Sequence, residues 1–154
     1  MITGKYPALR LRRNRKFNWT RRLIRENDLS SNDLILPIFL TEGKNKKQSI
    51  SSMPGIFRYS IDMISKIIDT ALSNRIPMVS FFPYTPQNKK NSLATEALNE
   101  NNLVCRALKL AKKKYKNEIG LMCDIALDPY TSHGHDGLLK NGKILNDETL
   151  KILL

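Results

Sequence analysis

The densest group of side chains in this sequence that could do chemistry lies in one segment, residues 124–137. Its sequence is DIALDPYTSHGHDG, and both histidines of the chain lie within it. The possible donors are the carboxylates of Asp124, Asp128 and Asp136, the imidazoles of His133 and His135, and the hydroxyls of Tyr130, Thr131 and Ser132. Oxygen and nitrogen donors at this density are suited to holding a cation or a polar substrate.

The donor types favour one class of metal without deciding that a metal binds. Carboxylate oxygens suit Mg²⁺, which keeps several waters and needs only one or two protein carboxylates. A thiolate zinc site is not supported, because no cysteine lies between residues 124 and 154. The His133-Gly-His135 spacing could serve a transition metal, but it is a weak indication by itself. A polar loop whose Asp and Ser side chains cap turns fits equally well at this point.

The segment follows the last of three short apolar runs that we interpret as buried strands, 34–40, 76–82 and 119–127. Runs of this length without polar alternation are typical of strands in a parallel sheet. Pro37 counts against the first run, because it cannot donate to a ladder. If the interpretation is right, residues 124–137 lie at the carboxyl end of a parallel strand, where functional groups of α/β folds collect.

Apolar residues at helical spacing predict helices between these strands. We expect helices over 61–74, with Ser60 as its cap, over 92–98 and over 101–116. A short amphipathic helix is expected over 17–26, and residues 41–59 are expected to be a loop. Strands that alternate with helices imply parallel βαβ units and therefore an α/β fold.

The charge of the chain is concentrated in its first 25 residues. The 154 residues carry a formal net charge of +12, and this stretch has nine Lys and Arg and no acid. A block of this kind is typical of an arm that meets nucleic acid, an anionic membrane or an acidic protein surface, or of a solvated tail. No apolar run approaches the ~18 residues of a membrane span. Cys105 and Cys123 are too few for a disulfide framework and indicate a reducing cytoplasm.

Several longer motifs follow one another along the whole chain. Besides 124–137 and 142–149 (GKILNDET), they are 10–15 (RLRRNR), 19–23 (WTRRL), 33–39 (DLILPIF), 52–55 (SMPG) with Arg58 and Ser60, 82–83 (FP) and 102–107 (NLVCRA). Together they resemble the porphobilinogen synthase family, also called δ-aminolevulinic acid dehydratase. The resemblance implies condensation of two 5-aminolevulinate molecules to porphobilinogen with loss of two waters, a step toward haem and other tetrapyrroles.

The resemblance also implies a fold and an assembly. The family fold is a (β/α)₈ barrel whose N-terminal arm wraps a neighbouring subunit, usually in an octamer. Here residues 1–32 are expected to form the basic arm, and residues 33–154 an incomplete TIM barrel of three βα units. The arm residues concerned are Arg10, Arg12, Arg13, Arg15 and Trp19. The block of positive charge is thereby assigned to a subunit contact, and we expect neither a membrane nor a nucleic-acid partner.

Site residues follow from matching the motif of residues 124–137. Zinc-dependent members carry three cysteines where this sequence has Ala126, Asp128 and Asp136. The chain thus resembles the aspartate-rich, magnesium-associated branch, and zinc is not expected. Asp128 and Asp136 are candidate metal ligands, although the match leaves open whether they bind the metal or hydrogen-bond substrate and water. The expected site wall is Asp124, Tyr130, Ser132 and His133.

The family's catalytic lysines are not expected in this sequence. They form Schiff bases at the ends of later strands, which activates the substrate ketone. None of the three expected strands contains a lysine, and lysines in loops and on outer helix faces stay protonated. We therefore expect an N-terminal portion of the enzyme without activity on its own. The alternatives are a non-catalytic chain that docks on an intact homologue and a basic nucleic-acid-binding module, whose affinity would fall steeply with salt.

Overall fold

The computed structural model of the protein describes residues 4–154. Two units are distinguished, one ending at Ser30 and one spanning Ser31–Leu154, and each is described by itself. Among the residues described, no helix has the length and apolar character needed to cross a membrane.

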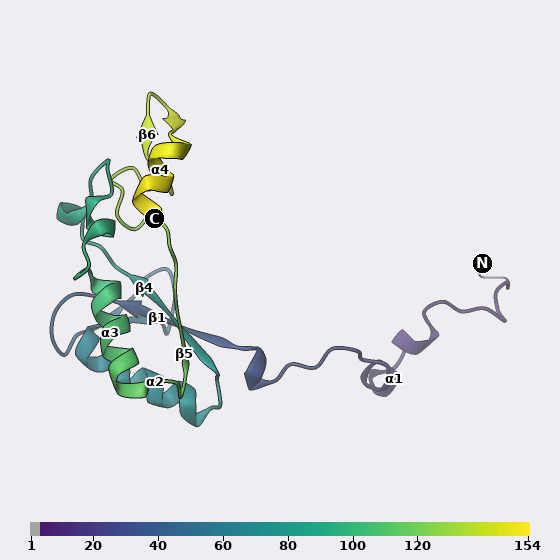
Figure 1. Cartoon of the computed structure of the whole chain (residues 1–154). Helices are drawn as coiled ribbons and strands as arrows, with labels where there is room; N and C mark the ends of the chain where they lie inside the picture. Colours follow the sequence, from purple (N-terminus) through teal and green to yellow (C-terminus); the bar gives the residue numbers. More distant parts are fainter. Residues whose placement is uncertain (1–3) are drawn as a thin grey trace. The chain divides into compact units, whose positions relative to one another are not determined.

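The larger unit is built on a five-stranded sheet with the order β2-β3-β1-β4-β5 (Figure 1). Its parallel strands β1 (Ile35–Leu40), β4 (Met78–Pro83) and β5 (Gly120–Cys123) correspond to the three expected apolar runs. β3 (Phe57–Tyr59) pairs parallel with β1 and antiparallel with β2 (Lys47–Ser49). The predicted α/β fold with a parallel sheet is confirmed, whereas closure into a barrel stays a prediction.

Two helices connect the parallel strands, and a hairpin and a further helix follow β5. The 3₁₀ turn Ile61–Met63 leads into α2 (Ile64–Ser73), and α3 (Leu103–Tyr115) joins β4 to β5. Beyond the candidate segment come a small hairpin, β6 (Leu139–Lys140) with β7 (Lys143–Ile144), and α4 (Asn146–Leu153). Asn102 caps α3, because its side chain accepts a hydrogen bond from the Cys105 amide.

The core lies between α2 and α3 and one face of the sheet. Alternate strand residues such as Ile38, Leu40 and Phe81 are buried against helical residues at i, i+4 spacing, such as Ile64 and Ile68. Burying each large side chain contributes about 1.5–3 kcal/mol, so these contacts determine the register of the strands. The parallel ladder directs the carboxyl ends of β1, β4 and β5 to one edge, where the candidate segment begins.

Pro37 is accommodated without loss of a ladder bond. The Thr41 amide donates to the Tyr59 carbonyl (2.9 Å), so every second residue back along β1 directs its nitrogen toward β3. However, β3 pairs with β1 only at Phe39 and Leu40. The missing N–H of Pro37 therefore points to a part of the edge where β1 has no neighbouring strand.

Four expectations about the elements are wrong. Residues 41–59 contain β2 and β3, whose three-residue strands are too short to show a period. The expected strand 119–127 ends at Cys123. The expected helix 92–98 is only a 3₁₀ turn, Thr95–Leu98, because the left-handed φ of 50° at Ala94 prevents a helix from running through that residue. Ser60 does not cap α2 through its side chain; its hydroxyl accepts the Lys46 amide instead (2.9 Å).

The unit that ends at Ser30 has little internal packing. It contains a 3₁₀ turn, Arg13–Arg15, and α1 (Asn18–Leu23), which is shorter than the expected helix 17–26, and neither element has a buried residue. The rings of Phe17 and Trp19 stack with centroids 6.1 Å apart, yet Trp19 remains 63% exposed. Its large apolar side chains therefore face solvent within this unit.

Candidate functional site

The candidate segment leaves the sheet at the end of β5 and begins to turn at Leu127. Asp124 is the first residue after the strand. The Leu127 carbonyl accepts hydrogen bonds from the amides of Tyr130 (2.8 Å) and Thr131 (2.9 Å), which closes a tight turn. The buried Thr131 hydroxyl then donates to the His135 carbonyl (2.9 Å). Local bonds thus determine the course of the chain between the two groups of polar side chains.

A pair of strand-like hydrogen bonds connects this turn to the segment between β4 and α3. The Asn91 amide donates to the Tyr130 carbonyl (3.2 Å), and the Asn91 carbonyl accepts from the Ser132 amide (3.1 Å). Together these bonds form an isolated parallel bridge between Asn91 and Thr131. Sequence reasoning missed Asn91, since its turn-rich neighbourhood indicates a loop but not which residues it contacts.

The other end of the segment rests on α4. The Leu138 amide donates to the Thr149 hydroxyl (2.9 Å), which itself donates to the Leu145 carbonyl (2.7 Å). Gly137 fits here because it lacks a side chain: a Cβ would lie 2.7 Å from Ile144 Cγ2 and 3.0 Å from Thr149 Oγ1. Thr149 is therefore a further supporting residue that the sequence did not identify.

The two histidines differ in their surroundings. The His135 amide donates to His133 Nδ1 (3.2 Å), so the neutral His133 ring carries its proton on Nε2. Gly134 between them has a φ of +75°, which a side chain would disfavour. His133 Nε2 is buried and has no hydrogen-bond partner among the described residues. A buried N–H of this kind is available to donate to a bound ligand.

The carboxylates of the segment affect one another. Partial loss of solvent raises the pKa of Asp128, and the negative charges of Asp136 and Asp124 raise it further. Across residues 4–154, no group of three or more His, Cys, Asp or Glu side chains is placed to hold a metal ion. A pair of carboxylates is nevertheless enough for Mg²⁺ with water ligands, so Asp128 and Asp136 fit that ion better than they fit zinc.

Two of the expected wall residues, Asp124 and Tyr130, line one cavity of about 180 Å³ with both cysteines. Ser132 and His133 do not line it. Tyr130 is 8% exposed, and burial, followed by the nearby Cys105 thiol, raises its pKa to about 12. Its phenol is therefore neutral at physiological pH. Burial likewise raises the pKa of Cys123, which keeps this thiol protonated.

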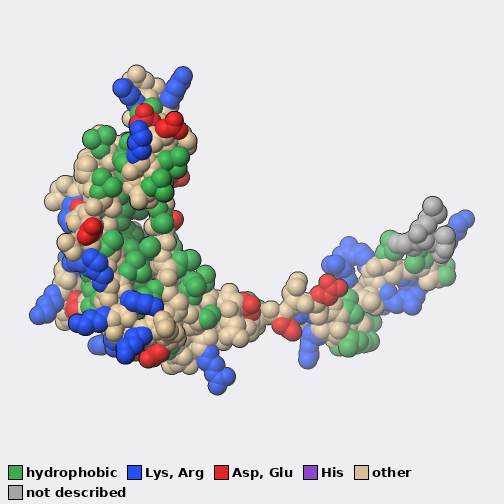
Figure 2. Space-filling view, viewed as in Figure 1, with side chains coloured by type: hydrophobic (Ala, Val, Ile, Leu, Met, Phe, Trp, Pro, Cys, Tyr) green, Lys and Arg blue, Asp and Glu red, His purple; other side chains and the backbone are tan. Residues whose placement is uncertain are grey.

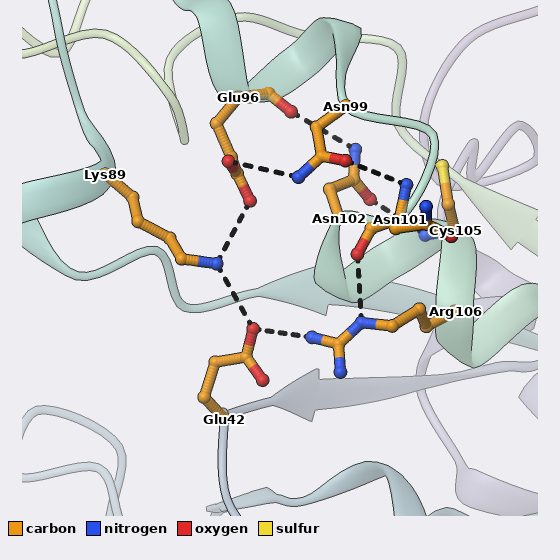
Figure 3. A network of polar contacts seen from close by, with 8 residues as sticks. All are labelled: Glu42, Lys89, Glu96, Asn99, Asn101, Asn102, Cys105 and Arg106. Carbon is orange, nitrogen blue, oxygen red and sulfur yellow. Dashed lines mark hydrogen bonds and ion pairs between the residues drawn. The ribbon is translucent and has the colours of Figure 1, made fainter.

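A network of charged side chains lies between the end of β1 and the start of α3 (Figure 3). Glu42, just beyond β1, accepts hydrogen bonds from Arg106 of α3 and from Lys89 (3.5 Å), and Lys89 also pairs with Glu96 (3.2 Å). The Arg106 hydrogen bond is the main cause that lowers the pKa of Glu42, and Glu96 is the main cause that raises the pKa of Lys89. These four residues join β1, the β4–α3 connection and α3.

The residues of the expected arm are exposed within their own unit. Arg10, Arg12, Arg13 and Trp19 line one hollow of about 820 Å³, and Arg15 is not part of its lining. Figure 2 shows basic and apolar side chains side by side over this unit. Nearby cations lie against aromatic rings, with the Arg10 guanidinium 5.3 Å from the centre of the Tyr6 ring.

Known proteins share this sequence and this fold. The sequence profile described as delta-aminolevulinic acid dehydratase matches residues 8–154. The chain is 50% identical over 147 residues to the delta-aminolevulinic acid dehydratase of Bradyrhizobium diazoefficiens, covering 96% of this chain and 41% of that protein. It is 41% identical to the Chlamydia pneumoniae enzyme of the same name, covering 93% of this chain and 43% of that protein.

A solved structure agrees with these matches. The crystal structure of delta-aminolevulinic acid dehydratase (porphobilinogen synthase) from Toxoplasma gondii, in complex with the reaction product porphobilinogen, superposes with a TM-score of 0.83 at 37% identity. That match covers 94% of this chain and 41% of the solved one, so the chain spans about two fifths of the length of these relatives. The profile, the two relatives and the solved structure all confirm the family resemblance: the chain belongs to the delta-aminolevulinic acid dehydratase family.

Proposed function

We propose that these residues are part of a porphobilinogen synthase, which condenses two 5-aminolevulinate molecules to porphobilinogen with loss of two waters. The observation that carries the proposal is the family match over residues 8–154, with a common fold in a relative that holds porphobilinogen. In this proposal the chain supplies the N-terminal part of an incomplete (β/α)₈ barrel and one wall of the site.

The proposed wall acts on the substrate through charge and hydrogen bonding. Asp124 lies at the end of β5 and lines the cavity, where its carboxylate can pair with the ammonium group of 5-aminolevulinate. His133 Nε2 can donate to a substrate oxygen, because it has no partner among the described residues. Tyr130 supports the wall from the buried side, and Ser132 lies beside His133 in the same turn.

We propose Mg²⁺ as the metal and Asp128 and Asp136 as the residues that would hold it. The mutual repulsion of these carboxylates supports a bound cation. When bound, Mg²⁺ would neutralise them and polarise a substrate oxygen.

The three parallel strands supply no lysine for the Schiff base. β1, β4 and β5 contain none, and Lys89 is held protonated between two carboxylates. We therefore propose that residues 1–154 do not make porphobilinogen by themselves, and that two strand-end lysines come from the part of the barrel that the relatives possess beyond the matched region.

A chimera tests the proposed function directly. Residues 8–154 replace the matching region of the Bradyrhizobium enzyme, to which they are 50% identical. We expect the chimera to convert 5-aminolevulinate to porphobilinogen, the isolated chain to make none, and Asp124→Asn to lower kcat of the chimera. A chimera that folds and assembles like its parent but makes no porphobilinogen would contradict the proposal, as would product formed by the isolated chain.

The first unit is proposed to contact another copy of the chain, as in a homo-octamer. Its exposed apolar side chains, such as Leu11, Leu23 and Trp19, favour a protein surface over a polyanion, which would need only the basic groups. Removal of residues 8–30 from the chimera, together with the relative's residues that precede them, is expected to yield smaller oligomers in light scattering. A salt-dependent shift of RNA or DNA would instead support a nucleic-acid partner. The free thiols Cys105 and Cys123 support a cytoplasmic location.

A further inference from the structure

The charged network of Glu42, Lys89, Glu96 and Arg106 is connected to the candidate segment through the β4–α3 connection. Lys89 and Glu96 form an ion pair (3.2 Å between Nζ and Oε1) that bridges the short segment between them, which contains Asn91 and is called the turn at Asn91 below. Within that turn, Asn91 Oδ1 accepts the amides of Leu93 (3.0 Å) and Thr95 (3.2 Å). The ion pair and the side chain of Asn91 thus restrict the same short stretch of backbone.

Asn91 also connects the restricted backbone to the candidate segment, residues 124–137. Its amide and carbonyl hold Tyr130 and Ser132 in the isolated bridge described above. Asp128 precedes the bridged residues and Asp136 follows them, so the backbone between the two carboxylates is held by the bridge. A displacement of Asn91 would alter the separation of these carboxylates.

Glu42 is the only one of the four charged residues that contacts both cations of the network. Oε1 of Glu42 accepts from Lys89, which belongs to the turn, and from Arg106, which belongs to α3 (Figure 3). Arg106 is further held by the Asn101 carbonyl (3.0 Å from Nε). A single carboxylate, that of Glu42, therefore connects the Lys89 side chain to β1, which Glu42 follows, and to α3, which contains Arg106.

We propose that Glu42 is a positioning residue for the candidate site: by pairing with Lys89 and Arg106 it fixes the turn at Asn91, and through Asn91 the backbone of Tyr130 and Ser132. The inference rests on the proposed function only in treating residues 124–137 as the site. It assigns a role to a side chain that touches none of the candidate ligands.

Amide exchange of the 154-residue chain, resolved by residue in NMR spectra, tests the proposal. Glu42→Gln keeps the size and an acceptor oxygen but removes the charge. We expect the Ser132 amide to exchange about threefold to tenfold faster, the change that corresponds to losing one or two exposed ion pairs. The Ala111 amide in the middle of α3 should not change. The matched control is Glu118→Gln, which removes the same charge at an exposed position.

Each alternative result has a defined meaning. Equal acceleration at Ser132 and Ala111 would show general destabilisation and overturn the positioning role. Faster exchange confined to Lys90, with Ser132 unchanged, would overturn the connection to the site. If Glu42→Gln does not fold, the unmodified chain in 1 M salt replaces it, because screening then acts within about 3 Å; unchanged exchange at Ser132 in high salt overturns the proposal.

A double-mutant cycle tests the route through Asn91. Thr95→Val removes the hydroxyl that accepts from Asn91 Nδ2 (2.6 Å). If the route is correct, the effects of Glu42→Gln and Thr95→Val on Ser132 exchange are not additive, and strict additivity overturns it. Absence of Mg²⁺ binding by the unmodified protein would count against the proposed function and leave the exchange comparison unaffected.

Discussion

Asp128→Asn is expected to stabilise the metal-free protein at neutral pH. Loss of solvent, Asp136 and Asp124 all raise the pKa of the Asp128 carboxyl above its ordinary 3.8. A carboxyl with a raised pKa in the folded state opposes folding once it is ionised, so its removal is favourable above that pKa. Below the unfolded pKa the carboxyl is protonated in both states, and the advantage of the Asn variant disappears.

The size of the effect is limited by exposure. The Asp128 side chain is exposed, so solvent screens the charges near it, and exposed charge pairs are worth about 0.2–1 kcal/mol each. Repulsion from one or two carboxylates therefore amounts to about 0.5–1.5 kcal/mol. With about 3–5 °C for each kcal/mol in a domain of this size, Tm should rise by about 2–7 °C.

Thermal unfolding followed by circular dichroism, at pH 7 in low salt with a chelator, measures this rise. Addition of Mg²⁺ should stabilise the unmodified protein, by ~1.4 kcal/mol at ten times Kd, and should stabilise Asp128→Asn less. Asp62→Asn is the matched control, because hydrogen bonds from Ser60 and Asn45 lower the pKa of Asp62 and its removal should be unfavourable. A lower Tm for metal-free Asp128→Asn, or equal stabilisation of both proteins by Mg²⁺, would refute the reasoning.

Three further substitutions test the packing that supports the site. Gly137→Ala should destabilise by about 1–3 kcal/mol, because its Cβ would lie 2.7 Å from Ile144 Cγ2, and Ile144→Ala should restore part of the loss in Tm. Asn102→Ala should cost about 1 kcal/mol in urea unfolding through loss of the α3 cap, whereas Asn102→Asp should not. Phe81→Ala, in the centre of the core, should cost about 3–5 kcal/mol in the same measurement, and a loss below 1 kcal/mol would contradict its assigned burial.

The elements that pack against the core were predictable from the sequence, because burial imposes a period on it. Ile64 and Ile68 follow the helical period, and the apolar runs identify β1 and β4 as strands. Continuous runs are typical of strands buried on both faces, whereas β1 has an exposed residue, Ile35, within it. β2 and β3 were not predictable, since strands of three partly exposed residues carry no such pattern. The run 119–127 was misleading for a related reason: Leu127 is buried in a second cluster with Ala94 and Tyr130, not in the sheet.

The candidate site could be predicted as a segment but not as an arrangement. Its donors are contiguous, so the density of Asp128, His133 and Asp136 is visible without a structure. Its supports are distant in sequence: Asn91 acts through its backbone amide and carbonyl, which nearly any residue type can supply, and Thr149 acts through its side-chain hydroxyl. No local pattern identifies such partners, so the sequence could not show what holds the donors in place.

The arrangement separates two tasks of the proposed reaction. Residues 124–137 are held from within this chain, by Asn91 on one side and Thr149 on the other, so in the proposed function the groups that would recognise the ammonium group and the cation have supports in the same chain. In the proposed reaction the amine that attacks the ketone would come from lysines outside β1, β4 and β5, because these strands contain none. In the chimera, substitutions in this segment should therefore change KM and the Mg²⁺ dependence while borohydride still traps the Schiff base on the relative's lysine. Loss of trapping in Asp128→Asn would show that the two tasks are not separate.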